Sequence, residues 1–268
     1  MQPIYTETAF LSAGEANPEQ ELSLSILMAK LIDIATAHAN SLGIGNPSMK
    51  EIKAGWVLSR VTIDMESYPK VNDSYCISTW MVSFNRHFSE RDFCISSPDG
   101  KIFGYARSIW MVMSTENHTN VGLSHFSLSK DLIDGREAPI EHQAKHGLIR
   151  RDVSIDEINK GVLPATHPVY EYRFKYSDLD SYRHVNTVRY VDLLLNRFSL
   201  STFDKSYVSR LELSFMHEAR YGMDIELLRH EPVEGKASFL IKEKDLPEKE
   251  GRPLFYARIN LKERACEK

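Results

Sequence analysis

The stretch that decides the fold is residues 21–42, with the sequence ELSLSILMAKLIDIATAHANSL. Apolar side chains recur in it at steps of three and four residues, which is the spacing of one face of an α-helix. The members of this stripe are Leu24, Leu27, Leu31, Ala35, His38 and Leu42. Gly43 and Gly45 follow, and glycine commonly lies just past the end of a helix. We therefore predict one long helix over 21–42. A lone histidine on such a face is more often a satisfied buried or boundary residue than a catalytic one, and we favour the first interpretation for His38.

After this helix the hydrophobic pattern changes to the period of two that is typical of β-strands. Strands are expected over 56–65, 75–84, 88–96 and 101–113, and Pro98-Asp99-Gly100 is expected to form a turn between the last two. A further short strand is expected over 4–10, before the helix. A long helix followed by successive antiparallel strands indicates an α+β fold, because alternating βαβ units are absent.

The same order of elements occurs a second time. A strand is expected over 169–176, a shorter helical stripe over 188–198, and strands over 210–218, 224–230, 237–242 and 254–261. Residues 121–168 are more polar and less periodic, and we interpret them as a linker with short helical pieces. The predicted organisation is a first domain over 1–120, a linker over 121–168 and a second domain over 169–268. Each domain is expected to wrap an antiparallel sheet around its own helix.

Composition excludes several classes of function. The 268 residues carry a formal net charge of -4, so there is no basic excess to neutralise phosphates, and no nucleic-acid partner is expected. The three cysteines match no zinc or disulfide spacing, which predicts no metal site. No run of about 18 apolar residues occurs, and the N-terminus lacks the basic and apolar regions of a signal peptide. We therefore expect a cytoplasmic protein without a membrane span.

Candidate catalytic groups are concentrated in residues 175–190, with the sequence KYSDLDSYRHVNTVRY. Asp178, Asp180, His184 and Asn186 fall where the strand of the second half should end and its helix begin. Free N–H groups at a helix N-terminus can stabilise an oxyanion, and a nearby carboxylate or imidazole can activate water. Spacing alone favours a simpler interpretation, in which an aspartate caps the helix and the other groups are polar residues of its first turn. The motifs GxSxG, HExxH, GxGxxG and the P-loop are absent.

A family resemblance reverses that preference. The pattern of Asp178, Asp180, His184-Val185-Asn186 and Tyr190 closely resembles the motif of acyl-acyl carrier protein thioesterases, plastid and bacterial enzymes that release fatty acids. Further similar stretches are Tyr68-Pro69, Thr79-Trp80, Ser108-Ile109-Trp110-Met111-Val112-Met113 and His38-Ala39-Asn40-Ser41-Leu42-Gly43. The resemblance covers nearly the whole chain. It implies two hotdog domains, each a sheet wrapped on a long helix, and hydrolysis of fatty acyl thioesters in fatty acid biosynthesis. It implies no metal and no organic cofactor.

The resemblance also implies which residues are catalytic. Asp180 and His184 match catalytic positions, and Glu218 matches the catalytic glutamate, which is expected here on the strand 210–218. The alternation of Leu213 and Phe215 puts Glu218 on the opposite face of that strand unless a bulge intervenes. We interpret Asp178 as a cap or a structural partner.

Two positions depart from the family motif. The family's cysteine after the glutamate is Ala219 here, which favours water over a thiol as the nucleophile. The family's asparagine two residues before the histidine is Tyr182. A tyrosine hydroxyl can donate one hydrogen bond to the thioester carbonyl, and Asn186 is a second candidate for that role. A packing role for Tyr182 is an equal alternative.

The resemblance further implies a partner, an acyl carrier protein with a fatty acyl thioester, and an apolar channel in the first domain for the acyl chain. Candidate channel residues are Leu27, Met28, Leu31, Val57, Trp80 and Trp110. Candidate groups for docking the acidic carrier protein are Arg150, Arg151, Arg183, Arg189 and Arg197. Two other functions stay open, an acyl-coenzyme A thioesterase of the same fold and a non-catalytic acyl-binding protein. A homodimer stays open beside a monomer in which the two halves pair.

Overall fold

The computed structural model of the chain describes residues 2–123, 132–133, 135–143, 153–244 and 251–265. The chain divides into two compact units, Met1–Glu141 and His142–Lys268. Residues 121–141, which were expected in the linker, belong to the first unit in this division. None of the described helices is both long and apolar enough to cross a membrane.

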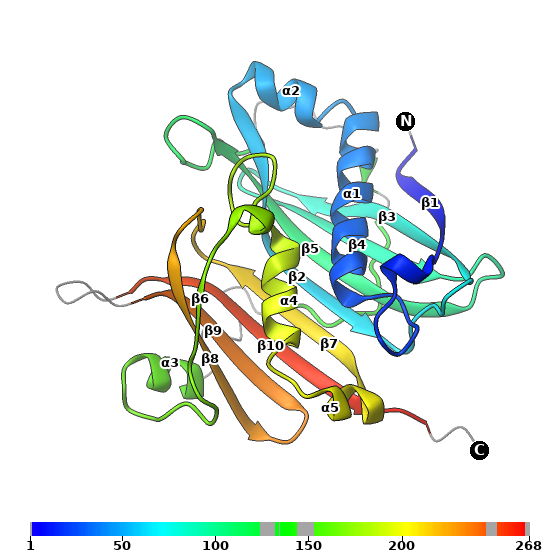
Figure 1. Cartoon of the computed structure of the whole chain (residues 1–268). Helices are drawn as coiled ribbons and strands as arrows, with labels where there is room; N and C mark the ends of the chain where they lie inside the picture. The colour runs from blue at the N-terminus through cyan, green and yellow to red at the C-terminus, as the bar shows by residue number, and fades with distance from the viewer. Residues whose placement is uncertain (1, 124–131, 134, 144–152, 245–250, 266–268) are drawn as a thin grey trace. The chain divides into compact units, whose positions relative to one another are not determined.

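The first unit is an antiparallel sheet with one long helix on it. Its strands are β1 (Ile4–Phe10), β2 (Ala54–Met65), β3 (Ser74–Phe84), β4 (Ser89–Ser96) and β5 (Ile102–Ser114). They lie in the order β1-β3-β4-β5-β2. Helix α1 (Leu24–Ser41) crosses one face of this sheet, and the short helix α2 (Asn46–Glu51) follows it (Figure 1). The five strands predicted in this half are confirmed to within two residues, and the helix begins at Leu24, three residues later than predicted.

The apolar stripe of α1 forms the core of the first unit. Leu27, Met28, Leu31 and Ile34 are all buried. His38 is completely buried on the same helix, as predicted. Burial of such a stripe against a sheet is what makes a helix of this kind stable in water.

Trp80, a predicted channel residue, lies on the other face of the first sheet. It clusters with Ala138 and Ile140, and its Nε1 donates to the carbonyl of Arg136 at 2.7 Å. Its neighbour Thr79 instead lies on the face toward α1, since Arg91 donates both to Thr79 Oγ1 and to His38 of α1. Successive side chains of a strand alternate between the two faces, so Trp80 lies on the face away from α1. The prediction that Trp80 lines a channel between helix and sheet is therefore wrong. Alternation alone does not tell which face of a strand a helix will cover.

The second unit has the same arrangement in its own residues. Its strands are β6 (Tyr170–Arg173), β7 (Ser206–Phe215), β8 (Asp224–Val233), β9 (Lys236–Glu243) and β10 (Pro253–Glu263), in the order β7-β10-β9-β8-β6. Helix α4 (Thr187–Leu195) crosses this sheet (Figure 1). The short helix α3 (Val153–Asn159) precedes β6 in sequence, and the short helix α5 (Leu200–Lys205), which was not predicted, lies between α4 and β7.

Aromatic rings fix α4 on its sheet. Tyr190 is stacked on Phe255 with ring centroids 4.8 Å apart, and it contacts Phe174 and Phe215 edge-on at 5.9 Å each. Val191 and Leu194 on the same helix are fully buried. The residues before α4 are thereby held against a rigid support.

Candidate active site

The loop before α4 is folded by hydrogen bonds to one carboxylate. Asp180 Oδ1 accepts from the backbone N–H groups of Tyr182, at 2.8 Å, and of His184, at 3.0 Å. The backbone N–H of Asp180 donates to the carbonyl of His184 at 2.8 Å, which closes the turn. Arg183 takes the left-handed conformation with φ 66° inside it. Asp180 therefore sets the direction in which the His184 side chain leaves the backbone.

The structure brings His184 and Glu218 together. His184 Nε2 lies 3.2 Å from Glu218 Oε2, and the two side chains are 29% and 39% exposed. Solvent and a ligand can therefore both reach this pair. Arg220 is also near, with its Nη2 3.9 Å from the same carboxylate oxygen.

Glu218 lies in a loop and not on a strand. Strand β7 ends at Phe215, so the alternation of that strand does not decide where Glu218 points. The predicted placement on a strand is wrong. The expectation that Glu218 points to the face opposite to Leu213 and Phe215 therefore does not apply. Backbone hydrogen bonding joins this loop to the motif, because the N–H of Val185 donates to the carbonyl of Ala219 at 2.9 Å.

An imidazole beside a carboxylate can transfer protons. When Glu218 accepts the Nε2 proton, the neutral ring of His184 keeps its basic lone pair on Nδ1. An imidazole in this state can take a proton from water, and the carboxylate then stabilises the imidazolium. The arrangement therefore suits hydrolysis by a general base.

Tyr190 lies near enough to Glu218 to interact with its charge. Its side chain is 3% exposed, and burial, with a smaller contribution from the negative charge of Glu218, raises the pKa of its hydroxyl above the ordinary value. The phenol is therefore neutral at any physiological pH. Tyr190 was predicted only as the last residue of the motif. Its position four residues after Asn186, one turn into the helix, was the signal in the sequence that its side chain lies near the site.

Asp178 has the structural role that was predicted for it. It is buried, and its Oδ2 accepts from the backbone N–H of Lys175 at 2.6 Å and from the hydroxyl of Tyr172 at 3.0 Å. These contacts fix the short 3-10 turn Tyr176–Asp178 that precedes the loop.

Asn186 caps α4. Its Oδ1 accepts from the backbone N–H of Val188 at 3.0 Å, and the helix begins at Thr187, three residues after His184. The N–H of Val188 is thus already bonded, and the Nδ2 group of Asn186 is the part left to donate. A catalytic role of Asn186 stays a prediction.

Tyr182 is 62% exposed, so it does not pack into the core. Its catalytic role also stays a prediction. Ala219, at the position of the family's cysteine, is buried. The described cysteines, Cys76 and Cys94, lie on β3 and β4 of the first unit, and Cys266 is outside the described residues.

The first unit contains the same loop with different side chains. Asn17 Oδ1 accepts from the N–H of Glu21 at 2.8 Å, as Asp180 accepts from His184. Gln20 has φ 60°, where Arg183 has 66°. Each loop forms two equivalent backbone bridges, Ala16 with Leu22 and Leu179 with Val185, then Glu21 with Lys70 and His184 with Arg220. The equivalent positions are Asn17 and Asp180, Gln20 and Arg183, Glu21 and His184, Ser23 and Asn186, and Tyr68 and Glu218.

In the two loops, the residues that hold the turn are similar, whereas the residues at the positions of the candidate catalytic pair differ. Asn17 and Asp180 both hold the turn through a side-chain oxygen. The His184–Glu218 pair, in contrast, corresponds to Glu21 and Tyr68. These two residues are a carboxylate and a phenol, so the first loop has no imidazole at this place to serve as the base. Of the two described loops, the one in the second unit therefore carries the pair suited to hydrolysis.

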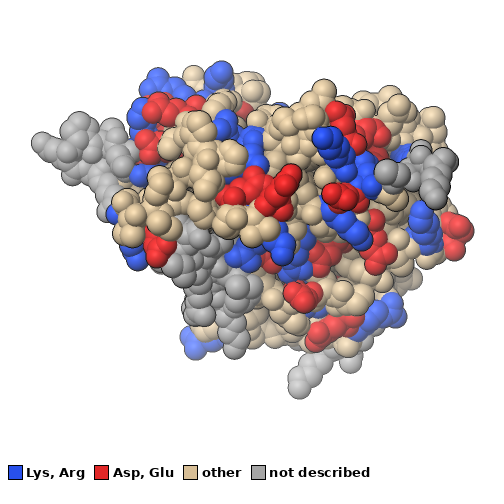
Figure 2. Space-filling view, turned by 90° about the horizontal axis from the view of Figure 1, so that it is seen from below, with Lys and Arg blue, Asp and Glu red and all other residues tan. Residues whose placement is uncertain are grey.

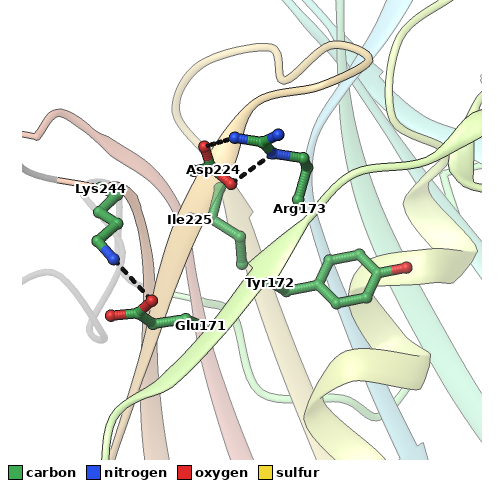
Figure 3. Close-up of a pocket in the computed structure, with 6 residues that line it drawn as sticks. All are labelled: Glu171, Tyr172, Arg173, Asp224, Ile225 and Lys244. Carbon is green, nitrogen blue, oxygen red and sulfur yellow. Dashed lines mark hydrogen bonds and ion pairs between the residues drawn. The ribbon is translucent and has the colours of Figure 1, made fainter.

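A hollow elsewhere on the second unit is lined by Glu171, Tyr172, Arg173, Asp224, Ile225 and Lys244 (Figure 3). Its charges pair with one another. Arg173 Nε donates to Asp224 Oδ1 at 2.7 Å and lowers the pKa of that carboxyl, and Lys244 Nζ donates to Glu171 at 2.6 Å. We assign no ligand to this hollow, because its charged groups already bind each other.

The predicted docking arginines differ in their surroundings. Arg189 contacts Asp192 at 2.9 Å, and Arg197 donates to the carbonyl of Pro168 at 3.2 Å. Arg183 is exposed, whereas Arg150 and Arg151 lie outside the described residues. Basic and acidic side chains are interspersed on the face drawn in Figure 2. Within the described part of the chain, no group of three His, Cys, Asp or Glu side chains could hold a metal ion.

Two sequence models of one family match most of the chain. Residues 3–123 match the model of the acyl-ACP thioesterase N-terminal domain, and residues 164–262 match that of the acyl-ACP thioesterase C-terminal domain, where ACP is the acyl carrier protein. His184 and Glu218 both fall within the second match.

Similar sequences include chloroplastic plant enzymes. A chloroplastic palmitoyl-acyl carrier protein thioesterase of Gossypium hirsutum is 24% identical over 80% of this chain and 52% of its own length. A chloroplastic dodecanoyl-[acyl-carrier-protein] hydrolase of Cinnamomum camphora is 23% identical over 88% of this chain and 61% of its own. The chain thus spans only about half to three fifths of the length of these relatives.

Solved structures share the fold. An acyl-ACP thioesterase from Bacteroides thetaiotaomicron superposes with a TM-score of 0.82 at 23% identity, over 97% of this chain and 98% of its own. A 12:0-ACP thioesterase from Umbellularia californica gives 0.75 at 17% identity, over 98% and 99%. The predicted α+β fold of two hotdog domains is confirmed by this likeness.

Proposed function

The chain belongs to the acyl-acyl carrier protein thioesterase family, and from this membership we propose that it hydrolyses fatty acyl-acyl carrier protein thioesters. The products are a free fatty acid and the carrier protein. One observation carries the proposal, the 3.2 Å contact between His184 Nε2 and Glu218 Oε2 on the loop that Asp180 holds. A solvent-accessible imidazole–carboxylate pair at this place supplies the base that thioester hydrolysis by water requires.

The reaction proceeds by direct attack of water on the thioester carbonyl carbon. His184 Nδ1 takes a proton from the water as its oxygen bonds to that carbon, and Glu218 stabilises the imidazolium that forms. The tetrahedral intermediate then breaks its C–S bond. The departing sulfur takes the proton from His184, so the carrier protein leaves as a thiol and the acyl group as a fatty acid.

Asp180 positions the histidine and is a candidate for orienting the water. Its Oδ1 is bonded to two backbone N–H groups, which leaves Oδ2 to accept from a water molecule. Tyr182 and Asn186 are the candidate donors to the carbonyl oxygen. The hydroxyl of Tyr182 and the Nδ2 group of Asn186 supply the N–H or O–H that an oxyanion needs.

The remaining features follow from this function as proposals. The first domain holds the acyl chain between α1 and its sheet, with the buried Leu27, Met28 and Leu31 among the lining residues. The exposed Arg183, next to His184, is our first choice for docking the acidic carrier protein. We place the activity in fatty acid biosynthesis in the cytoplasm, and fractionation of the source cells tests this location, since the plant relatives are chloroplastic. Mass measurement in solution tests for a homodimer.

The function is tested by comparing two thioesters of one fatty acid, linked to acyl carrier protein or to coenzyme A. We expect faster hydrolysis of the carrier-protein thioester over a series of saturated chain lengths. Faster turnover of the coenzyme A thioester would reject the proposed substrate. Binding of acyl chains without hydrolysis of any thioester would instead identify an acyl-binding protein.

A further inference from the structure

One arginine in the interior of the first unit has donors that no described residue accepts from. Arg91 lies on β4 and is 5% exposed. Its Nη1 donates to His38 Nδ1 at 2.7 Å and to Thr79 Oγ1 at 3.2 Å. Both of its described hydrogen bonds thus use one nitrogen and go to neutral groups. No described hydrogen bond uses Nε or Nη2, and neither atom is among the fully buried polar atoms without a partner, so both face space that a ligand oxygen can reach.

The guanidinium lies between α1 and the sheet. Arg91 alternates along β4 with Phe93 and Ile95, which are both buried, and it reaches His38 on α1. These residues therefore share the face of β4 that the helix covers. The charge is thus located in the apolar interior where we propose that the acyl chain lies.

His38 supplies no counter-charge. Since arginine can only donate, His38 Nδ1 must accept, and Nε2 then carries the proton directed to the carbonyl of Gln2 at 3.2 Å. Burial, followed by the nearby positive charge of Arg91, lowers the pKa of His38 to about 4. The pair therefore carries one net positive charge at neutral pH.

The neighbouring arginine shows how this chain neutralises a buried charge. On the other face of the sheet, Arg107 Nε and Nη2 donate to the two oxygens of Asp92, at 2.7 Å each. The same carboxylate accepts from the backbone N–H of Ala138 at 2.7 Å. Arg91 has no such carboxylate within the described residues. An unpaired buried charge is unfavourable for folding, so a ligand is the natural source of its missing acceptor.

We propose that Arg91, supported by His38, determines which acyl chains the first unit accepts. The site binds a chain that carries an oxygen at this depth, as a hydroxyl, oxo or carboxyl group, and disfavours a hydrocarbon end that reaches the same point. An oxygen satisfies the free N–H groups, whereas a methyl group would leave them unpaired in an apolar surrounding. The inference rests on the proposed function, in which the first domain holds the acyl chain.

The test compares Arg91→Gln with Arg91→Lys. Glutamine keeps a donor for His38 Nδ1 but removes the charge, whereas lysine keeps the charge. The substrates are saturated acyl-acyl carrier protein thioesters of increasing length, plain or with a terminal hydroxyl. In the wild type, kcat/KM should fall at least tenfold once the plain chain reaches Arg91, and the hydroxylated chain of that length should react at least tenfold faster. In Arg91→Gln we expect plain chains to gain about fourfold per added methylene, the worth of burying one such group. Arg91→Lys should keep the wild-type limit.

Two results would overturn the inference. One is the same chain-length profile in the wild type and Arg91→Gln, with hydrolysis intact, which leaves the proposed function standing. The other is a melting temperature of Arg91→Gln many degrees below that of the wild type, which would make Arg91 a structural residue. If no thioester is hydrolysed, calorimetric binding of fatty acid methyl esters, plain or with a terminal hydroxyl, decides the same preference. Equal affinity of the two esters for the wild type would then reject it.

Discussion

His184 and Glu218 come from two loops and meet with Nε2 3.2 Å from Oε2, while Asp180 holds the backbone N–H of His184 at 3.0 Å. One carboxylate thus orients the residue and the other pairs with its ring. The two carboxylates have different partners, so substitution can separate their roles.

Replacement of His184 by alanine should abolish most of the activity. Loss of a general base lowers kcat by about 100- to 10,000-fold, and we expect Glu218→Gln to cause a smaller loss because the amide still accepts the Nε2 proton. Steady-state hydrolysis of an acyl-acyl carrier protein thioester measures both. His217→Ala is the matched control, since this exposed histidine hydrogen-bonds the carbonyl of Pro253 and not the pair. Full activity of His184→Ala would reject its catalytic role.

Asp180→Asn and Asp180→Ala should separate positioning from chemistry. Asparagine holds the equivalent turn at Asn17, so Asp180→Asn should keep the stability of the wild type. Asp180→Ala loses the acceptor of two backbone N–H groups, which should lower the free energy of unfolding by about 1–3 kcal/mol. Denaturant unfolding measures this difference. If the negative charge of Asp180 orients water, the asparagine variant also loses at least tenfold in kcat. Wild-type kcat in that variant would limit Asp180 to positioning.

Tyr182→Phe should lower kcat by about 2- to 10-fold, the worth of one hydrogen bond to the carbonyl oxygen. Stability should not change, because the side chain is largely exposed. Tyr182→Asn introduces the family's residue and shows whether an amide serves better at this position. Unchanged kcat in the phenylalanine variant would exclude the hydroxyl from the reaction.

Asp92→Ala should destabilise the first unit strongly. It removes the carboxylate that accepts from both Nε and Nη2 of the buried Arg107, and leaves this guanidinium with the longer contacts to Glu90, at 3.6 Å, and Glu137, at 3.8 Å. Removal of one partner of a buried ion pair costs about 3–5 kcal/mol. Glu116→Ala removes the partner of Lys53 in an exposed pair and should change stability by less than about 1 kcal/mol. Chemical unfolding of both variants against the wild type checks the contrast. Equal losses in the two variants would contradict it.

Acid should destabilise the protein through His38. Its pKa is about 4 in the folded chain and 6.5 as the ordinary value, so the unfolded chain binds more protons between these limits. Stability from this group is therefore full above pH 6.5 and is lost as the pH falls to 4, by about 3 kcal/mol in total. His38→Gln should flatten this part of the curve of unfolding free energy against pH. An unchanged difference between wild type and variant across this range would refute the linkage.

Periodicity was sufficient to predict the strands and the central helix of both halves, since burial imposes a period near 3.6 on α1 and of two on β2 to β5. It did not predict the short helices α2 and α5. It failed where hydrogen bonds of irregular backbone decide the structure. Glu218 was assigned to a strand because nothing in the sequence marks the end of β7 at Phe215. Arg91 was not singled out, since a single arginine in an alternating strand looks like an exposed residue until its surroundings are known.

The similarity of the two loops, 16–23 and 179–186, could not be predicted from the sequence either. Their residues differ at most positions, and the equivalence rests on bridges and backbone angles. His184 and Glu218 were identified through the family motif, because the spacing alone favoured a capped helix.

The paired loops have a consequence for how the sequence can change. In the first unit the turn persists with Glu21 and Tyr68 where the second unit has His184 and Glu218. The turn thus forms with two different sets of side chains at these two positions, whereas both loops use an oxygen-bearing side chain at the position of Asn17 and Asp180. Selection for folding and selection for turnover therefore act on different residues of one loop. Substitutions at the positions of His184 and Glu218 can therefore remove the activity of such a loop, or change it, without loss of the turn.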